Sequence, residues 1–329
     1  MIDQAFNRIS DGFGVAHQLL FERVVQPLLF NLGQANLLEE GYGATGWLLV
    51  GLVQLVVIIV VFGTLQRWWP VEPITDRRAV RVDILYTLLH RLGLFRVALF
   101  FTIDPLWDLL FGEMSLAGWG GLHLDDALAP MLPGISDAAW FAFVAYLLVF
   151  DFADYWLHRG QHRFHWWWAL HSLHHSQRQM TMWSDNRNHL LDDLLRDVLF
   201  VLLARLIGVA PGQFVAIVAL TQLVESLSHA NLRTGFGLLG ERLLVSPRFH
   251  RLHHSIGLGH ESNGRGTLGG HNFAVLFPVW DMLFGTANFE HRYDPTGIRD
   301  QLPEAGGRNY GDGFWSQQWR GLRRVIGAD

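Results

Sequence analysis

The sequence predicts an all-α integral membrane protein with about four transmembrane helices, some of them paired as a short hairpin, and a cytoplasmic helical cap that carries histidine motifs. Three observations lead to this fold class. Half of the 329 residues are hydrophobic and only 17% are charged, which is unusual for a soluble domain. Long apolar runs alternate with connections that are rich in arginine. Many of the 17 histidines gather just beyond the ends of these runs.

The clearest apolar run covers residues 45–63. It reads TGWLLVGLVQLVVIIVVFG, and Gln54 is its only strongly polar interior residue. A helix of this length rises about 28 Å, close to the ~30 Å thickness of the hydrocarbon core. The run has no polar face, which argues against a buried helix of a soluble protein. It also starts too far from the N-terminus for an ordinary signal peptide.

The other apolar segments are shorter or interrupted. Residues 97–111 contain internal acidic residues, whereas residues 138–157 carry carboxylates only near their end. Residues 198–207 and 214–224 are separated by a Pro-Gly pair, and we expect them to form a helical hairpin that dips into the bilayer. Residues 15–32 are expected to form an interfacial helix or a further span.

Arginine placement predicts the orientation of these segments. Arginines follow the first and third runs, in residues 64–96 and 158–193, whereas residues 113–137 contain acidic residues and no arginine. By the positive-inside rule, the two arginine-bearing connections face the cytoplasm and residues 113–137 face outside. Arginines after residue 230 make the later part cytoplasmic as well. Most histidines therefore fall on the cytoplasmic side.

Composition excludes several classes of protein. The chain has no cysteine, so it cannot form a disulfide scaffold, a thiolate zinc site or an iron–sulfur cluster. Its net charge is −5 and it has no cluster of basic residues, which argues against a nucleic-acid partner. The positive mean hydropathy of +0.19 argues against disorder.

Three motifs concentrate the histidines. His158 and His162 form HxxxH, and HxxHH occurs at residues 171–175 and again at 250–254. On a helix, residues at i, i+3 and i+4 share a face, so these imidazoles can converge on a metal ion such as Zn, Cu, Fe or Ni. Eight to ten such histidines would fill two adjacent sites. The candidate ligands are His158, His162, His171, His174, His175, His189, His229, His250, His253 and His254.

Two carboxylates accompany these histidines. Asp154 lies one helical turn before His158, where it could accept the second N–H of a ligating imidazole. Glu225 lies one turn before His229 and is expected either to bind metal or to act as a buried hydrogen-bonding partner. No HExxH motif is present, which weakens the interpretation as a metalloprotease. The spacing leaves open whether His189, Glu225, His260 and His271 contact metal.

The motifs resemble those of the fatty acid hydroxylase/sterol desaturase superfamily, whose members are integral-membrane di-iron enzymes of the histidine-box type. The first family motif, Asp-x3-His-Arg-x2-His, is found at residues 154–162. The second, HxxHHS, is found at 171–176, and the third, Pro-Arg-(Phe/His)-His-x2-His-His-Ser, at 247–255. The resemblance covers residues from about 140 to 287, and its features look like those of bacterial members.

Shorter family elements follow in the same order along the chain. An Arg-x-His element stands at residues 187–189, His-x-Asn at 229–231, and Trp-Asp-x2-Phe-Gly-Thr at 280–286. The sequence departs from the family pattern at Leu190, where proline is frequent, and at Phe273, where tyrosine is usual. Residues 256–270 are also unusually rich in glycine. These departures leave the substrate in doubt.

The resemblance implies a membrane-bound oxygenase that hydroxylates or desaturates a lipid or sterol-like substrate. It implies two iron ions, O₂ as co-substrate and an external electron donor, either a ferredoxin or a cytochrome b5-type protein with an NAD(P)H reductase. The expected place is the bacterial inner membrane, with the active site on the cytoplasmic side. The expected organisation is membrane helices in 1–135, the di-iron catalytic domain in 136–290 and a polar tail in 291–329.

Two alternatives remain at this point: a non-catalytic membrane metal carrier or sensor, and a zinc-dependent membrane hydrolase. A transporter should place ionisable residues along a path near mid-membrane. Residues 45–63 and 138–150 contain no histidine and no charged residue. The histidines instead follow the helix ends, which favours the enzyme. Substrate identity and oligomeric state are not predicted.

Overall fold

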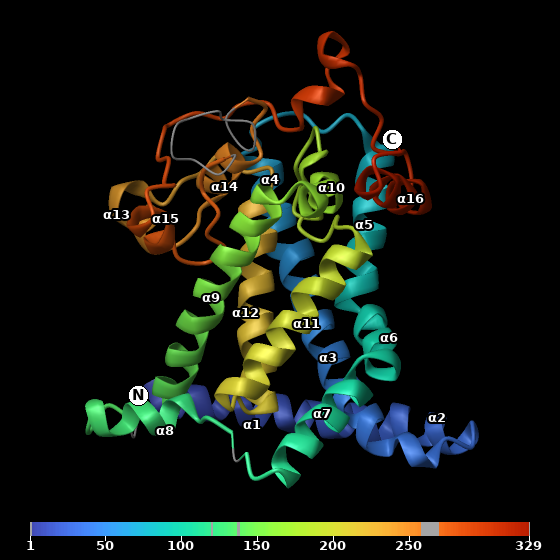
Figure 1. Cartoon of the computed structure of the whole chain (residues 1–329), viewed down its shortest axis with the longest axis vertical. Helices are drawn as coiled ribbons and strands as arrows, with labels where there is room; N and C mark the ends of the chain where they lie inside the picture. Colours follow the sequence, from blue (N-terminus) through green and yellow to red (C-terminus); the bar gives the residue numbers. More distant parts are fainter. Residues whose placement is uncertain (1, 120, 137–138, 258–269, 329) are drawn as a thin grey trace. The chain divides into compact units, whose positions relative to one another are not determined.

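The structure, a computed structural model, describes residues 2–119, 121–136, 139–257 and 270–328 (Figure 1). In these ranges the chain is helical and has no strand; its β-structure is an isolated bridge between Ser255 and Thr296. The α-helices are α1 (Ile2–Leu20), α2 (Gln26–Asn31), α3 (Leu38–Val57), α4 (Gly63–Trp68), α5 (Arg77–Arg91), α6 (Leu94–Thr102), α7 (Asp104–Leu116), α8 (Leu124–Leu128), α9 (Ala139–Arg163), α10 (His165–His175), α11 (Leu190–Ile207), α12 (Pro211–His229), α13 (Gly237–Leu243), α14 (Pro247–His253), α15 (Val279–Leu283) and α16 (Phe314–Val325). Two π-helical segments, Phe21–Val25 and Ile58–Phe62, and four short 3-10 segments, Ala35–Leu37, Ala129–Met131, Arg299–Gln301 and Pro303–Ala305, connect some of them.

The chain divides into two compact units, each built from separated segments. The first unit comprises Met1–Leu55, Leu89–Leu148 and Val198–Ala219. The second comprises Val56–Leu88, Val149–Asp197 and Leu220–Asp329, and it contains all ten predicted metal ligands.

Two helices are long and apolar enough to cross a membrane. They are Ala35–Trp68, in which the π-helical segment joins α3 to α4, and Trp140–Arg163, which is nearly all of α9. The sequence predicted about four spans. The apolar run at 97–111 is divided between α6 and α7, and neither is long enough to span. The predicted hairpin segments lie in α11 and α12, and their spanning stays a prediction.

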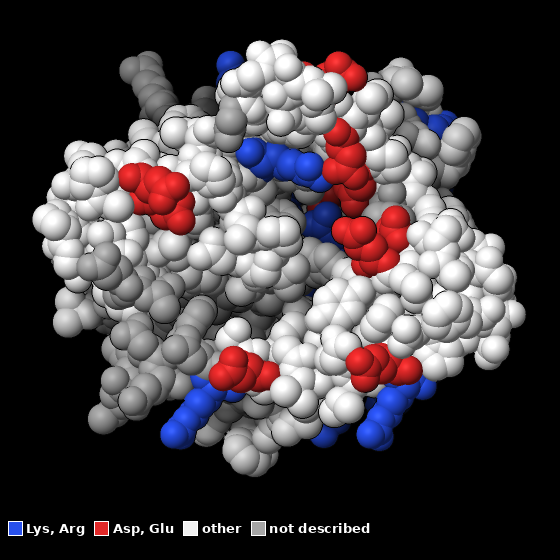
Figure 2. All heavy atoms as spheres, turned by 90° about the horizontal axis from the view of Figure 1, so that it is seen from below, with Lys and Arg blue, Asp and Glu red and all other residues white. Residues whose placement is uncertain are grey.

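The middle of the first candidate span presents apolar side chains to its surroundings. Val53, Val56, Ile59 and Val60 are each more than half exposed. A continuous apolar surface of this kind is rare on soluble proteins and suits contact with lipid. The face of the molecule seen from below is also formed mostly by uncharged side chains, with acidic and basic residues scattered on it (Figure 2).

Gln54, the polar residue in that apolar run, is satisfied within the first unit. Its side-chain amide donates to the carbonyl of Ala219 at 2.9 Å and accepts a hydrogen bond from Arg91 at 3.2 Å. A side chain at Gly51 would overlap the carbonyl of Arg91, so glycine permits this close approach. The strongly polar residue inside the apolar run therefore serves helix packing.

Two buried carboxylates shape the second unit around the histidine motifs. Asp151 on α9 accepts hydrogen bonds from the backbone N–H groups of Leu276 and Phe277 and from the Trp280 indole. Asp281 on α15 accepts from the backbone of residues 273–274 and from Thr286. Together they fix the loop before α15 against α9, with Phe273 and its neighbours fully buried. This loop supplies part of the site described below.

Candidate metal centre

Four helices of the second unit supply the clustered histidines. His158 and His162 occupy the last turns of α9, and His171, His174 and His175 lie along α10. His229 is the last residue of α12, and α14 carries His250 and His253 with His254 as its C-terminal cap. Ser246 begins α14 by accepting a hydrogen bond from the backbone N–H of Phe249. Helix termini therefore meet at this site.

The structure brings nine of the ten predicted ligands together in two groups. The first cluster contains His158, His162, His171 and His175, and the second contains His174, His229, His250 and His254. Within each cluster the candidate ligand atoms lie within 4.8 Å of one another. The His253 ring lies 4.4 Å from His158 and 4.7 Å from His162, measured between ring centroids, and so adjoins the first cluster.

The two clusters lie next to each other. The rings of His175 and His254 are stacked with their centroids 4.3 Å apart, and each of these residues belongs to a different cluster. The adjacent residues His174 and His175 also fall in different clusters. Neighbouring residues on a helix point about 100° apart, so α10 contributes ligands to both.

Distances in the second cluster suit a metal ion. The Nε2 atom of His229 lies 3.1 Å from Nε2 of His174 and 3.0 Å from Nε2 of His250. The Nδ1 atom of His229 lies 2.8 Å from the carbonyl oxygen of Glu225, which can only accept. Nδ1 therefore holds the proton, and Nε2 presents a lone pair. Two nitrogen ligands about 2.1 Å from one ion and at right angles to each other lie about 3.0 Å apart. A cation among these nitrogens would remove the repulsion between their lone pairs.

The first cluster is oriented in a similar way. His158 places Nδ1 at 2.7 Å from the carbonyl oxygen of Phe273, and His171 places Nδ1 at 3.1 Å from Oδ2 of Asp192. His253 makes a corresponding 2.7 Å contact with the carbonyl oxygen of His271. Among the described residues, the buried Nε2 atoms of His158 and His171 have no hydrogen-bond partner. Ligating imidazoles are held by such contacts on the other nitrogen, so the residues fit a metal site.

Burial also favours the neutral imidazole that metal binding requires. The pKa values of His174 and His175 on α10 lie well below the ordinary range because burial penalises the charged form and neighbouring histidines repel it. The same causes lower the pKa values of His250 and His254. These four imidazoles are therefore in the neutral form at pH 7. Each can bind a metal through its unprotonated nitrogen without first losing a proton.

Asp192, at the start of α11, is a site residue that the sequence patterns did not identify. Besides His171, it accepts hydrogen bonds from Gln161 at 2.8 Å and from the Trp167 indole at 2.6 Å. Burial by itself would raise the pKa of Asp192, but the hydrogen bonds and the interaction with His171 together lower it. Asp192 is therefore an ionised carboxylate behind the first cluster. The pair of acidic residues in the first turn of this largely apolar helix was the available signal.

His189 lies outside both clusters. Its Nε2 is 2.8 Å from the carbonyl oxygen of Gln318, and its Nδ1 accepts a hydrogen bond from the backbone N–H of Leu191. Both ring nitrogens are thus engaged by α16 and by the start of α11. His260 lies outside the described residues, and His271 contributes its carbonyl oxygen to His253.

Asp154 and Glu225 meet a common partner, Arg196 on α11. The guanidinium Nη2 lies 2.7 Å from Oδ1 of Asp154 and 3.7 Å from Oε1 of Glu225. The hydrogen bond on His158 that was expected from Asp154 is made by the carbonyl of Phe273. Asp154 thus anchors Arg196 beside the histidines.

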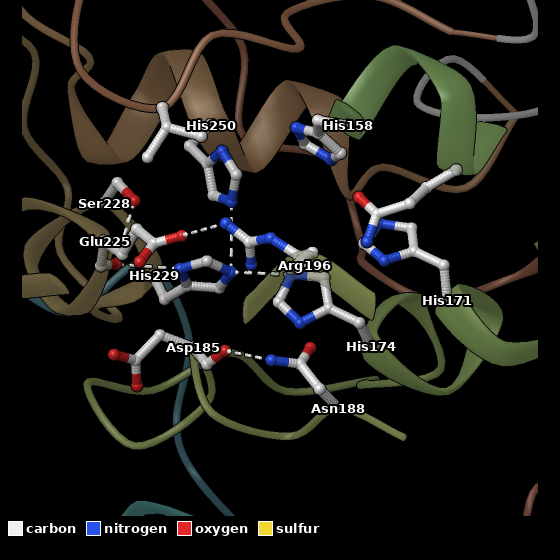
Figure 3. A pocket seen from close by; sticks show the side chains of 12 residues that line it. His158, His171, His174, Asp185, Asn188, Arg196, Glu225, Ser228, His229 and His250 are labelled. Atoms are coloured by element: carbon white, nitrogen blue, oxygen red, sulfur yellow. Dashed lines mark hydrogen bonds and ion pairs between the residues drawn. The ribbon is translucent and has the colours of Figure 1, made fainter. Parts of the chain in front are cut away.

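A small cavity opens beside both clusters, with Arg196 and Glu225 on its wall (Figure 3). Its volume of about 30 Å³ holds one or two molecules of the size of water or O₂. Its lining combines metal-cluster histidines with polar side chains: His158, Gln161, His171, His174, Asp185, Asn188, Arg196, Glu225, Ser228, His229, His250 and Val275. The cavity therefore adjoins both clusters and three charged side chains, those of Asp185, Arg196 and Glu225.

Comparison with known proteins agrees with the motifs. The family described as fatty acid hydroxylase matches residues 143–286, which include all nine clustered histidines. An ornithine lipid hydroxylase of Rhizobium tropici is 28% identical over 254 residues, 77% of this chain and 70% of the relative. An alkylglycerol monooxygenase of Danio rerio is 30% identical over 151 residues, 46% of this chain but only 31% of the relative. No solved structure matches the chain. The resemblance predicted from the motifs is confirmed.

Proposed function

Because the chain is a membrane-bound oxidoreductase with a fatty acid hydroxylase domain at residues 143–286, we propose that it is a di-iron monooxygenase that hydroxylates a membrane lipid. One C–H bond of the lipid is broken and one C–O bond is formed. The lipid, O₂, two electrons and two protons give the alcohol and one water. The electrons come from a separate donor, a ferredoxin or a cytochrome b5-type protein with its reductase.

The observation that carries this proposal is the pair of adjacent four-histidine clusters. Imidazole nitrogen is a good ligand for iron, and the chain has no thiolate to offer. Each cluster provides enough ligands for one ion, and the clusters adjoin at the stacked rings of His175 and His254, so two ions bound in them would be neighbours. Two irons bound here would supply the redox chemistry that reduces O₂. A single structural zinc would leave half of these buried nitrogens without a function.

The surrounding residues hold the ligands and control the cavity. Backbone carbonyls and Asp192 keep the protons of several imidazoles on Nδ1, so that Nε2 faces the metal. The cavity has room for O₂ but for only one or two water molecules, which would limit unproductive reactions. We assign Glu225 to proton transfer rather than to metal binding, because its carboxylate lines the cavity within 3.7 Å of Arg196.

The substrate is proposed to be a lipid with a polar head group. One of the two relatives is named as an ornithine lipid hydroxylase, and the other is named as an alkylglycerol monooxygenase. Both names describe oxygen insertion, so hydroxylation is preferred to desaturation. The candidate spans and the α11–α12 hairpin would present the acyl or alkyl chain to the clusters from the bilayer. We place the clusters on the cytoplasmic side of a bacterial inner membrane, in agreement with the arginine distribution.

Lipid mass spectrometry of cells with and without the gene tests the reaction. We expect a lipid class whose mass rises by 16 units when the protein is present. A loss of 2 units would contradict hydroxylation and indicate desaturation. Purified protein should contain two irons per chain and consume O₂ in the presence of a reductant and lipid. A single zinc without O₂ uptake would refute the proposal and favour a hydrolase.

Single substitutions connect the activity to the clusters. His171→Ala and His174→Ala each remove a ligand from a different cluster, so both should lose iron and O₂ uptake while still inserting into the membrane. His165→Ala is the matched control, because His165 is an exposed histidine at the start of α10 and lies in neither cluster. Full activity in either ligand variant would exclude that cluster from the reaction.

A further inference from the structure

Helix α16, near the C-terminus, exposes a stripe of large apolar side chains. Trp315, Trp319 and Ile326 are 78%, 63% and 76% exposed, and Leu322 is 40% exposed. Their spacing of four, three and four residues places them within about 60° of one another on a helix. Such a stripe is costly in water unless something covers it.

The opposite side of α16 is fixed within the second unit. The side chain of Gln318 donates to the Tyr86 hydroxyl at 2.9 Å and accepts from the backbone N–H of Leu190, also at 2.9 Å. Gly321 lies so close to His189 that a side chain there would overlap the imidazole. Figure 1 shows α16 beside α10, and the two helices are in contact. The apolar stripe therefore cannot be buried by rotation of the helix.

The charges on α16 have one sign. Arg320, Arg323 and Arg324 are the only charged residues between positions 313 and 328. On a helical projection Arg323 lies next to the apolar stripe, and Arg320 lies further round the helix on the same side. Ser316 lies between these two arginines. The helix thus has three sectors: one buried in the protein, one apolar and exposed, and one that carries Arg320 and Arg323. Arg324 belongs to the buried sector, where it donates to the carbonyl of Ala169.

We propose that α16 is an in-plane helix that binds the anionic surface of the membrane, with Trp315, Trp319, Leu322 and Ile326 inserted among the lipids. A helix with Trp and Leu on one face and arginine beside it is typical of interfacial segments. Arginine side chains can cover apolar surface with their stems and place their guanidinium groups at lipid phosphates. The partner is therefore lipid with negatively charged head groups.

Other features of the second unit support lipid rather than protein as the partner. Trp68 and Trp69, at the end of the first candidate span, are 67% and 56% exposed, and Trp166 is exposed just after the second. Exposed tryptophans at span ends are typical of the membrane–water interface.

The absence of cysteine from the chain permits a direct test. Trp319→Cys in the full-length protein is labelled with an environment-sensitive fluorophore and reconstituted into phosphatidylcholine vesicles with and without phosphatidylglycerol. We expect blue-shifted emission, quenching by lipids that carry a spin label on the acyl chain, and protection from iodide. These effects should be stronger with phosphatidylglycerol. Ser316→Cys, an exposed position in the arginine sector, is the matched control and should stay accessible to iodide.

Three results would overturn the proposal. The first is equal iodide quenching at both positions, which would leave the stripe in water. The second is protection of position 319 from iodide without quenching by spin-labelled lipid, which would indicate that a second copy of the chain covers it. The third is emission that does not respond to phosphatidylglycerol, which would refute the role of the arginines. Each of these readings is independent of iron content and of O₂ uptake.

Discussion

Replacing Asp192 with asparagine is expected to weaken metal binding at the first cluster more than its small change in shape suggests. The Oδ1 atom of Asp192 accepts from Gln161 and Trp167, while Oδ2 faces Nδ1 of His171. An asparagine that keeps its oxygen toward the first two donors must turn its NH₂ group toward His171. The imidazole would then accept at Nδ1 and carry its proton on Nε2, the nitrogen that faces the cluster. The same tautomer effect is known from the catalytic triad, where aspartate-to-asparagine substitution preserves geometry but not activity.

The expected loss follows from the role of Asp192 behind a ligand. Removing such a hydrogen-bonding partner typically lowers metal affinity by 10- to 100-fold, or about 1.4 to 2.8 kcal/mol. Asp192→Ala should add a loss of folding stability, because the buried donors of Gln161 and Trp167 would each lose an acceptor at a cost of about 1 to 3 kcal/mol. Asp192→Asn therefore separates the effect on metal binding from the effect on folding.

The assay is competition for Fe²⁺ between the metal-depleted protein and a chelator of known affinity. Asp192→Asn should release one iron at a lower chelator concentration than the wild-type protein and lose O₂ uptake in parallel. Asp193→Asn makes the same chemical change at the next residue of α11 and should bind both irons like wild type. An unchanged affinity in Asp192→Asn would refute the argument that this carboxylate sets the tautomer of His171.

Three further predictions follow from individual residues. Burial raises the pKa of Asp83 from 3.8 to about 7, so between these values the folded state holds a proton that the unfolded state has lost, and the contribution of Asp83 to stability should fall by ~1.4 kcal/mol per unit as the pH rises. The buried histidines titrate in the same range with the opposite sign, so this slope should be read from the difference in the free energy of unfolding between wild type and Asp83→Asn in detergent between about pH 5 and 7. Gly321→Ala should lower stability by about 1 to 3 kcal/mol in thermal unfolding, because its methyl group would overlap His189, whereas Gly313→Ala meets no atom and should not. Glu225→Gln should keep both irons but slow O₂ uptake by about 100-fold, since it removes a titratable group from the cavity; loss of iron instead would identify Glu225 as a ligand.

The membrane helices could be predicted only where hydropathy is strong. The run at 45–63 identified the first span, but the helix extends from Ala35 to Trp68 because its polar flanks are helical as well. Hydropathy carries no information about such flanks. Hydropathy gives only a short, interrupted run at 97–111, and there the chain leaves one helix at Thr102 and starts another at Asp104. Proline at the start of the second helix fits this break, since proline is tolerated in the first turn and not in a helix interior.

The histidine spacing predicted which side chains gather, because neighbours at i, i+3 and i+4 share a helix face. It could not predict how they divide, since His174 and His175 enter different clusters only after four helix ends have met. The sequence motif by itself groups His189 with the ligands. In the structure its ring contacts the carbonyl oxygen of Gln318, which lies 129 residues away in the chain. Contacts of that separation depend on tertiary packing, and neither local pattern nor composition reports them.

The contacts behind the two clusters differ, although each cluster offers four imidazoles. His171 of the first cluster faces the ionised carboxylate of Asp192, whereas His229 of the second faces the neutral carbonyl of Glu225. A carboxylate makes the imidazole that it holds a stronger donor to metal than a carbonyl does. An ion in the first cluster would therefore be bound by a more electron-rich imidazole at His171 than the imidazole that His229 offers in the second. None of the groups that create this difference belongs to a histidine motif, so two chains with identical motifs can hold electronically different metal pairs.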